Sequence, residues 1–311
     1  MKTRQSRNKQ RIRVKKNQLF ATLLFLVGFA IFTYPFYQNA FSQYLDQQVI
    51  RQFQKESAAK NQAELAAIQA EMVAENERKQ ADTDLLAKEL AASEALLANG
   101  ASDTTSNSTQ DFFVEHTLGV LTIPAINGEM PIYDRGTETF LNRGAALLNG
   151  SSLPVGGEST HAVIMAHRGM PEAELFSKLP EINEGELFFI EINGEKLAYE
   201  VDQIKIIEPT EIDDLQIVEG EDYVTLMTCT PYMVNSHRYL VRGKRTTYLE
   251  EHAQLKDTVR WKTWLKIIGT IVGILAIAGL VVFWLNRKQR TPQGSTKQNH
   301  RYVGKTFPNV K

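Results

Sequence analysis

The 311-residue sequence contains a single cysteine, Cys229. One cysteine excludes an intrachain disulfide and any metal site built from several thiolates. The sequence also lacks internal repeats, a glycine-rich phosphate-binding loop and a basic nucleic-acid patch. Its acidic residues are scattered rather than gathered into a calcium-binding cluster. We therefore expect no metal, no other cofactor and no nucleic acid as a partner.

Acidic residues are absent from both ends of the chain. Residues 1–16 carry eight Lys and Arg, and residues 287–311 carry seven. The segment between them holds the other 20 basic residues and all 36 acidic ones, a net charge of −16, although the whole chain is near neutral at −1. The hydropathy pattern supplies a physical reason for this segregation.

Two long runs without charge adjoin the basic ends. They are Leu19–Tyr37 and Ile267–Leu285, each long enough to cross the hydrocarbon core of a bilayer as a helix. Tryptophans, which favour the membrane interface, flank the second run. The positive-inside rule places both basic ends in the cytoplasm. We therefore expect a multi-pass cell-membrane protein whose acidic middle segment is extracytoplasmic.

The first run has a second interpretation, as a cleaved signal peptide, because signal peptides also combine a basic start with an apolar middle. The run continues as YPFYQNAFSQ, which offers no clear small-x-small cleavage site, so we interpret it as an uncleaved anchor. An exported chain with one free thiol fits a host that forms few disulfides, such as a Gram-positive bacterium.

Residues 41–98 contain no glycine or proline and are rich in residues that favour helix. We predict a long helix or helical hairpin that forms an extracytoplasmic stalk. Two roles remain open for it, a face for a partner and a solvated spacer. Asn99-Gly100 is a helix stop, and the polar segment ASDTTSNSTQ that follows is typical of a flexible linker.

Between Phe113 and Tyr248 the pattern changes to short runs of β-branched and aromatic residues. Asn193-Gly194 separates two of them, which is a strong hairpin signal. The candidate strands are LGVLTI, MPIY, HAVIMAH, ELFFIEI, KLAYEV, QIKII, YVTLMTC and RYLVRG. About eight strands with little helix predict a mainly β fold, a closed or nearly closed barrel.

The cysteine lies at the end of the predicted strand YVTLMTC. A lone cysteine is often a small buried hydrophobe. Here, however, Arg238 follows on the next strand, and a guanidinium stabilises a thiolate and also an oxyanion. Acyl transfer further needs a proton carrier, for which histidine is suited. His167 ends the strand HAVIMAH at the mouth of a loop and is our candidate. His161 is interpreted as structural, and His237 as a packing or surface residue.

Two neighbours of these residues are weighed in the same way. Thr228 directly precedes the cysteine, so it either positions the backbone, contacts substrate or is an ordinary β-branched strand residue. Arg242 shares a face with Arg238 and is interpreted as a surface or structural charge.

These residues carry a resemblance to a known family. TLMTC, Thr225–Cys229, followed by Arg238 in HRYLVRG, resembles the TLxTC signature of sortases. The stretch Ser151–Phe176 resembles the histidine region of class C, pilus-assembling sortases, which also carry a C-terminal membrane span. The resemblance covers residues 113–248, and its three motifs occur in the order of the family.

The resemblance implies an eight-stranded sortase β-barrel and a membrane-bound cysteine transpeptidase. It makes Cys229 the nucleophile that cleaves an LPxTG-type sorting signal between Thr and Gly through a thioester. His167 is then the proton carrier, and Arg238 holds the substrate backbone or the oxyanion. In class C the acceptor is a pilin lysine, so the implied partners are LPxTG-type pilins or surface proteins.

One feature of many class C sortases is missing here. Their lid places an Asp-Pro-aromatic motif over the cysteine, and this sequence contains no Asp-Pro dipeptide. We therefore expect a missing or atypical lid and an accessible thiol.

Two other functions remain open. A sortase that attaches surface proteins to cell-wall peptide differs only in the acceptor amine, which the sequence does not fix. A membrane-anchored scaffold with a catalytically silent barrel would act through its helical stalk. A papain-like protease is disfavoured, because such enzymes place the cysteine at a helix N-terminus.

The predicted organisation has eight segments. They are a basic cytoplasmic segment (1–16), a transmembrane helix (17–37), the stalk (38–99), the linker (100–112), the barrel (113–248), a juxtamembrane segment (249–266), a second transmembrane helix (267–286) and a basic cytoplasmic tail (287–311).

Overall fold

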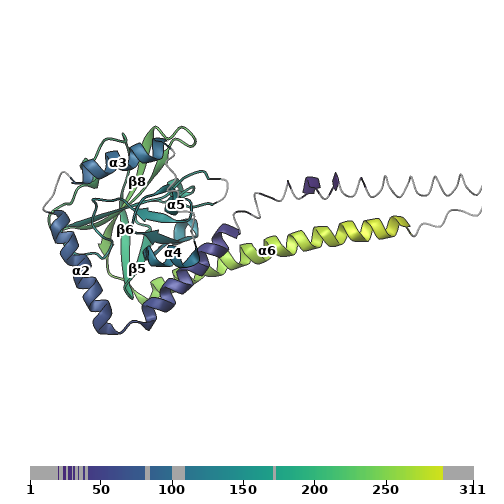
Figure 1. Ribbon diagram of the computed structural model, residues 1–311, viewed down its shortest axis with the longest axis horizontal. Helices are drawn as coiled ribbons and strands as arrows, with labels where there is room; N and C mark the ends of the chain where they lie inside the picture. Colours follow the sequence, from purple (N-terminus) through teal and green to yellow (C-terminus); the bar gives the residue numbers. More distant parts are fainter. Residues whose placement is uncertain are drawn as a thin grey trace, which may run out of the picture. The chain divides into compact units, whose positions relative to one another are not determined.

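The computed structural model describes residues 41–80, 85–99, 109–170 and 173–289, together with scattered residues between 20 and 38. The chain divides into two compact units, Met1–Thr270 and Ile271–Lys311. The first unit holds all the strands and most of the described helices (Figure 1). It is therefore the unit that matters for the site.

Eight strands form a closed barrel in the order β1-β2-β3-β4-β7-β8-β6-β5. The pairs β2–β3 and β4–β7 are parallel, and the other neighbours are antiparallel. The strands are β1 (Thr117–Ile123), β2 (Gly128–Tyr133), β3 (Ala145–Leu147), β4 (Thr160–Met165), β5 (Leu187–Ile192), β6 (Glu195–Ile207), β7 (Asp222–Thr230) and β8 (His237–Thr246). The closed barrel agrees with the fold predicted from the sequence.

Two details of the predicted strands are corrected. KLAYEV and QIKII belong to one strand, β6, whose register shifts between Val201 and Gln203 where it pairs with β8. The shift leaves Asp202 as an extra residue, which is the arrangement of a β-bulge. The three-residue strand β3 has no counterpart among the predicted runs, because so short a segment shows no alternation.

Apolar side chains pack on both faces of the strands. Inside the barrel, Ile164, Leu226 and Val241 are fully or almost fully buried in one cluster. On the outer face of β4, β7 and β8, a second cluster contains Val163, Met165, Met227 and Leu240. Because successive strand residues point to opposite faces, the alternation of these two sets fixes which residues face outward. The catalytic candidates can then be placed by register.

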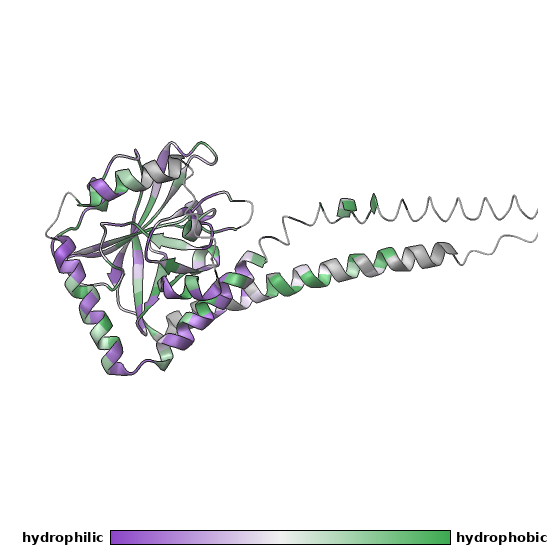
Figure 2. Cartoon of the chain, in the orientation of Figure 1, coloured by the Kyte–Doolittle hydropathy of each residue, from purple (hydrophilic) through white to green (hydrophobic). Residues whose placement is uncertain are grey.

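The described part of the predicted stalk is helical. A helix covers residues 41–59, followed by α2 (Gln62–Gln80) and α3 (Leu85–Asn99). Asn61 and Glu64 cap α2 reciprocally: the Glu64 N–H donates to Asn61 Oδ1 and the Asn61 N–H donates to Glu64 Oε2. Figure 2 shows hydrophilic and hydrophobic residues interspersed along α2.

These helices also pack on the barrel. Val49, Ile50 and Leu90 are at most 3% exposed. The Asn76 amide makes two bonds to the backbone of Leu153 in the β3–β4 connection: its oxygen accepts from the N–H and its Nδ2 donates to the carbonyl. The described residues of the segment therefore belong to the globular body of the first unit.

The remaining helices are short, apart from the last. They are α4 (Gln110–Glu115), α5 (Glu138–Leu141), the 3₁₀ turns η1 (Pro124–Ile126), η2 (Leu179–Glu181) and η3 (Asp213–Leu215), and α6 (Glu250–Gln289). The predicted linker over 100–112 lies mostly outside the described residues, and its end forms the start of α4.

The two predicted membrane spans differ in how much of each the structure describes. The first, 17–37, lies mostly outside the described residues, whereas the second, 267–286, falls within α6. Among the residues that the structure describes, no helix combines the length and apolar character needed to cross a membrane. The two spans therefore stay a prediction.

Candidate active site

Cys229, His167 and Arg238 lie at the same end of three neighbouring strands. Strands β7 and β8 pair so that Cys229 is directly opposite Arg238. Strand β4 runs parallel to β7 with Met165 beside Met227, and the Ala166 N–H donates to the Met227 carbonyl at 3.2 Å. His167 follows directly, at the level of Cys229. The structure thus brings together the three residues predicted from the sequence.

The three residues lie on the outer face of these strands. Met165, Met227 and Leu240 belong to one apolar cluster on this face. His167 and Cys229 lie two positions after Met165 and Met227, and Arg238 lies two positions before Leu240. Because side chains two residues apart point to the same side of a strand, the reactive groups continue this outer face. The three residues therefore belong to the outer side of the barrel wall.

Cys229 has the surroundings of a reactive thiol. It is partly exposed and forms no disulfide. Directly opposite residues on antiparallel strands have Cβ atoms about 5 Å apart, so the side chain of Arg238 starts beside that of Cys229. A neighbouring cation stabilises a thiolate, which is the nucleophilic form of cysteine.

Arg238 is held in place by the connection between β7 and β8. The residue is only 7% exposed. Its Nη1 donates to the carbonyl oxygens of Asn235 at 3.0 Å and His237 at 2.9 Å. Bonds to fixed backbone atoms reduce the freedom of the guanidinium. Such a preorganised donor can stabilise an oxyanion that forms beside the thiol.

His167 is partly buried, and a carboxylate lies beside it. Burial lowers the pKa of His167, because desolvation disfavours the charged imidazolium. The carboxylate of Glu138 lies 3.8 Å from His167 Nε2 and acts in the opposite direction, raising the pKa. The neutral ring is thus favoured, with a carboxylate close enough to stabilise the protonated ring when it forms.

Glu138 is a residue that the sequence does not reveal. It is the first residue of α5, between β2 and β3, and no motif or spacing connects it to the histidine region. Its acidic side chain at a helix start has an ordinary explanation in the helix dipole. The contact with His167 depends on the closed barrel.

The side chain of Thr228 points to the inner face of the barrel, as does that of Leu226 two residues earlier. It is 2% exposed, and its hydroxyl donates to the Ala166 carbonyl at 2.7 Å. This bond connects β7 to the end of β4. Its two residues each come one position before a site residue, Cys229 or His167. Of the roles that the sequence leaves open for Thr228, the contact supports positioning of the backbone.

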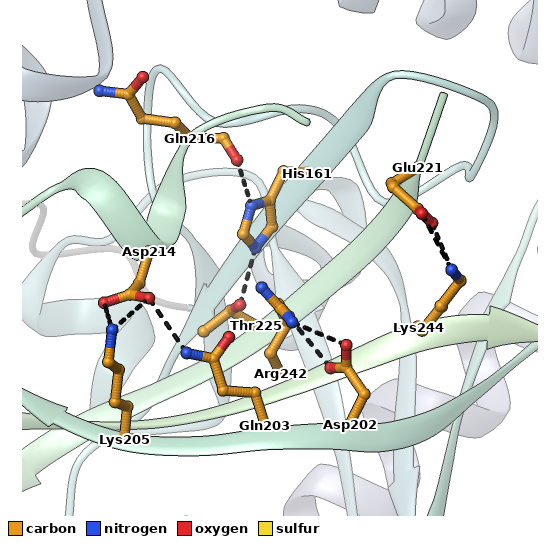
Figure 3. A network of polar contacts seen from close by, with 10 residues as sticks. All are labelled: His161, Asp202, Gln203, Lys205, Asp214, Gln216, Glu221, Thr225, Arg242 and Lys244. Carbon is orange, nitrogen blue, oxygen red and sulfur yellow. Dashed lines mark hydrogen bonds and ion pairs between the residues drawn. The ribbon is translucent and has the colours of Figure 1, made fainter. Parts of the chain in front are cut away.

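A polar network occupies the same outer face farther along the strands (Figure 3). His161 lies between the Gln216 carbonyl oxygen, 2.8 Å from Nδ1, and the Thr225 hydroxyl, 2.7 Å from Nε2. Arg242 forms a two-pronged ion pair with Asp202, the extra residue of the β6 bulge, at 3.0 and 2.7 Å. His161 and Arg242 therefore have structural partners, as the sequence interpretation expects.

His161 gives a pH-dependent contribution to stability. Burial lowers its pKa from 6.5 to about 4. The unfolded chain binds a proton below pH 6.5 while the folded chain does not, so stability is lost as pH falls from 6.5 towards 4, by up to about 3 kcal/mol. Urea unfolding of the full chain at pH 7, 5.5 and 4.5 should show a weaker acid destabilisation in His161→Gln.

The matched control is His237→Gln, which alters an exposed histidine whose Nε2 lies 3.2 Å from Glu208. This variant should show the same change of unfolding free energy with pH as the unaltered chain. Asp46 has a pKa raised to about 7 by burial and acts with the opposite sign, but it is common to all three proteins. If the free energy of unfolding changed equally with pH in His161→Gln and in the unaltered chain, the pH-dependent role of His161 would be contradicted.

Part of the outer face is covered by α3. Leu86 and Leu90 of this helix belong to the same apolar cluster as Met227, two residues before the nucleophile. Cys229 itself keeps partial exposure. The Ser/Thr-rich part of the linker, the other candidate cover, lies outside the described residues.

The described residues offer no cluster of three His, Cys, Asp or Glu side chains that would hold a metal ion. The reactive groups gathered at the ends of β4, β7 and β8 are a thiol, an imidazole and a guanidinium. This combination fits acyl transfer through a thioester, because it supplies a nucleophile, a proton carrier and an oxyanion donor.

Comparison with known proteins agrees with this chemistry. The sortase domain model matches residues 121–246. Streptococcus agalactiae sortase C1 is 41% identical, with a TM-score of 0.54, covering 65% of this chain and 97% of the other. Streptococcus pneumoniae sortase C-1 is 39% identical, with a TM-score of 0.55, covering 65% and 100%.

A curated relative, sortase A of Bacillus anthracis, is 26% identical over 238 residues, 76% of this chain and 95% of that protein. The chain belongs to the sortase family, and the two solved structures named above are class C sortases. It is a sortase cysteine transpeptidase.

Proposed function

We propose that this sortase polymerises pilins. It cleaves an LPxTG-type sorting signal between Thr and Gly through a thioester on Cys229 and passes the acyl group to a pilin lysine. The single observation that supports this most strongly is the placement of Cys229 opposite Arg238, with His167 at the end of the adjoining strand.

The first half-reaction breaks the Thr–Gly bond. The thiol proton of Cys229 passes to His167, and the thiolate attacks the threonine carbonyl carbon to form an oxyanion that Arg238 stabilises. The carbon–nitrogen bond then breaks, and His167 gives its proton to the departing glycine amine. The products are a thioester on Cys229 and a free glycine-bearing peptide.

The second half-reaction reverses these roles. The incoming lysine, as its neutral amine, attacks the thioester carbon, and the neutral ring of His167 takes the proton that the nitrogen loses. The carbon–sulfur bond breaks, an isopeptide bond forms and the sulfur leaves as thiolate. The lowered pKa of His167 is consistent with the step in which the ring accepts a proton.

Pilin as substrate is supported by the similar proteins. One is a sortase C1 of a pilus island in GBS, 41% identical over 94% of that chain. Another is a Streptococcus pneumoniae sortase C described together with its pilin substrate specificity, 40% identical over 98% of that chain. The family also includes enzymes of other classes, so the acceptor needs a direct test.

The test offers the purified enzyme an LPxTG-type peptide together with one of two amines, a lysine-containing pilin fragment or a cell-wall peptide. We expect cleavage after threonine and an isopeptide product with the lysine, identified by mass spectrometry. Product with the wall peptide alone would favour the cell-wall function. No acyl product with any amine would overturn the proposal.

We also propose that the enzyme is embedded in the cell membrane by two spans, with the barrel outside and both termini in the cytoplasm. The basic ends and the acidic middle segment support this topology. Cys229→Ala provides a thiol-free background for single cysteines at Ser6, Ser57 and Ser295. A membrane-impermeant maleimide should label intact cells only through S57C. Labelling of S6C or S295C without permeabilisation would contradict the topology.

A further inference from the structure

The contact between Glu138 and His167 takes no part in the two half-reactions described above. The distance of 3.8 Å from Glu138 Oε2 to His167 Nε2 is too long for a hydrogen bond but short enough for electrostatic attraction when the ring is protonated. Both side chains are partly buried, 35% exposed for Glu138 and 23% for His167. Water therefore screens this pair less than it screens an ion pair on the surface.

Aromatic packing fixes the position of Glu138. It begins α5, whose residues Phe140 and Leu141 are each 2% exposed. The ring of Phe112 from α4 stacks on Phe140 with centroids 5.3 Å apart and planes inclined by 8°. The ring of His116 lies 5.2 Å from Phe140. Because α4 and α5 are packed together in this way, the carboxylate is presented to His167 from a rigid support.

His167 is held from its own side as well. Its carbonyl oxygen accepts a hydrogen bond from the Phe176 N–H at 3.1 Å, which closes the loop that follows β4. The next residue, Arg168, directs its guanidinium to the Thr230 hydroxyl at 3.1 Å. The imidazole therefore lies between fixed backbone and the Glu138 carboxylate.

The charges around the imidazole are of both signs. Glu138 on α5 contributes a negative charge, and so does the Cys229 thiolate on β7 once it is ionised. Arg238 on β8 and Arg168 contribute positive charges. In the resting site, Glu138 is the carboxylate that opposes the effect of burial on the pKa of His167.

We propose that Glu138 is a positioning residue for His167, whose carboxylate holds the imidazole at the mouth of the site and stabilises its protonated form during acyl transfer. The inference rests on the proposed function, because it assigns a further member of the same catalytic group. Protonation of the leaving amine requires the imidazolium, so a fixed carboxylate beside the ring increases the fraction of enzyme ready for this step.

The test compares Glu138→Gln and Glu138→Asp with the unaltered full chain. Glu208→Gln is the matched control, because Glu208 lies 3.2 Å from His237 in an exposed pair outside the site. Two quantities are measured: kcat/KM for an LPxTG-type peptide as a function of pH, and the pKa of His167 from the NMR signals of labelled histidine. His167→Asn assigns the signal.

We expect Glu138→Gln to lower the pKa of His167 and to reduce kcat/KM by about tenfold, since one pKa unit changes the protonated fraction tenfold. Glu138→Asp should recover part of both, and Glu208→Gln should change neither. An active enzyme in which Glu138→Gln matches Glu208→Gln would overturn this inference alone. Lower thermal stability with an unmoved pKa would show a purely structural role and would also overturn it. Failure of the proposed function is recognised separately, by activity that survives in Cys229→Ala.

Discussion

Replacing Cys229 with alanine is expected to abolish acyl transfer, with a loss in kcat of at least about 10³-fold. The nucleophile is the one group whose removal eliminates the covalent intermediate altogether, so neither Arg238 nor His167 can compensate. In cells that contain no other sortase, high-molecular-weight surface polymers should disappear. The measurements are the rate of peptide cleavage in vitro and the polymer pattern on a denaturing gel.

The matched control is Met227→Leu. Met227 lies on the same face of β7, two residues before the nucleophile, and leucine nearly conserves its volume, so stability should change little. Its activity should remain close to that of the unaltered enzyme. Polymers that persist in Cys229→Ala would contradict the enzymatic role. Loss of function only on deletion of residues 41–98 would favour the scaffold.

Replacing Arg238 with alanine is expected to reduce kcat/KM by about 10²- to 10³-fold, the usual effect of losing one preorganised donor to an oxyanion. The kcat/KM of Arg238→Lys should fall between those of Arg238→Ala and the unaltered enzyme, because lysine keeps the charge but lacks the planar fork. The buried side chain also holds the carbonyls of Asn235 and His237, so some stability is lost. The rate constants are therefore compared at a temperature where thermal unfolding shows every variant to be folded.

Arg242→Gln separates the catalytic effect from the general loss of a charge. Arg242 points to the same face of β8, four residues farther along, but its guanidinium is paired with Asp202. This variant should lose stability while its kcat/KM stays within a few-fold of the unaltered value. Equal losses of kcat/KM in Arg238→Ala and Arg242→Gln would remove the special role of Arg238.

The reactive residues are visible in the sequence because they follow well-patterned strands. YVTLMTC and HAVIMAH are short runs rich in apolar and β-branched residues, so the amino-acid pattern alone places Cys229 and His167 at strand ends. The short connection between Cys229 and Arg238 indicates that their strands are neighbours. The barrel class follows from the same patterns, whereas the family and the substrate class come from the resemblance of the motifs.

Other features depend on contacts that no local pattern encodes. Asp202 interrupts the alternation of β6 because it is the extra residue of a bulge, so one long strand reads as two. The 41–98 segment has the composition of a solvated helix, yet a few apolar residues such as Val49 and Leu90 suffice to pack it on the barrel. Glu138 reaches His167 only after β2, β3 and β4 have closed side by side.

The most direct test of the thioester mechanism is the intact mass of the enzyme after brief mixing with an LPxTG-type peptide and no amine. We expect an increase equal to the peptide up to its threonine, carried by Cys229 as a thioester and removed when an amine is added. The same adduct should be absent from Cys229→Ala. An enzyme that cleaves the peptide without ever carrying this mass, or that carries it on another residue, would contradict the central claim.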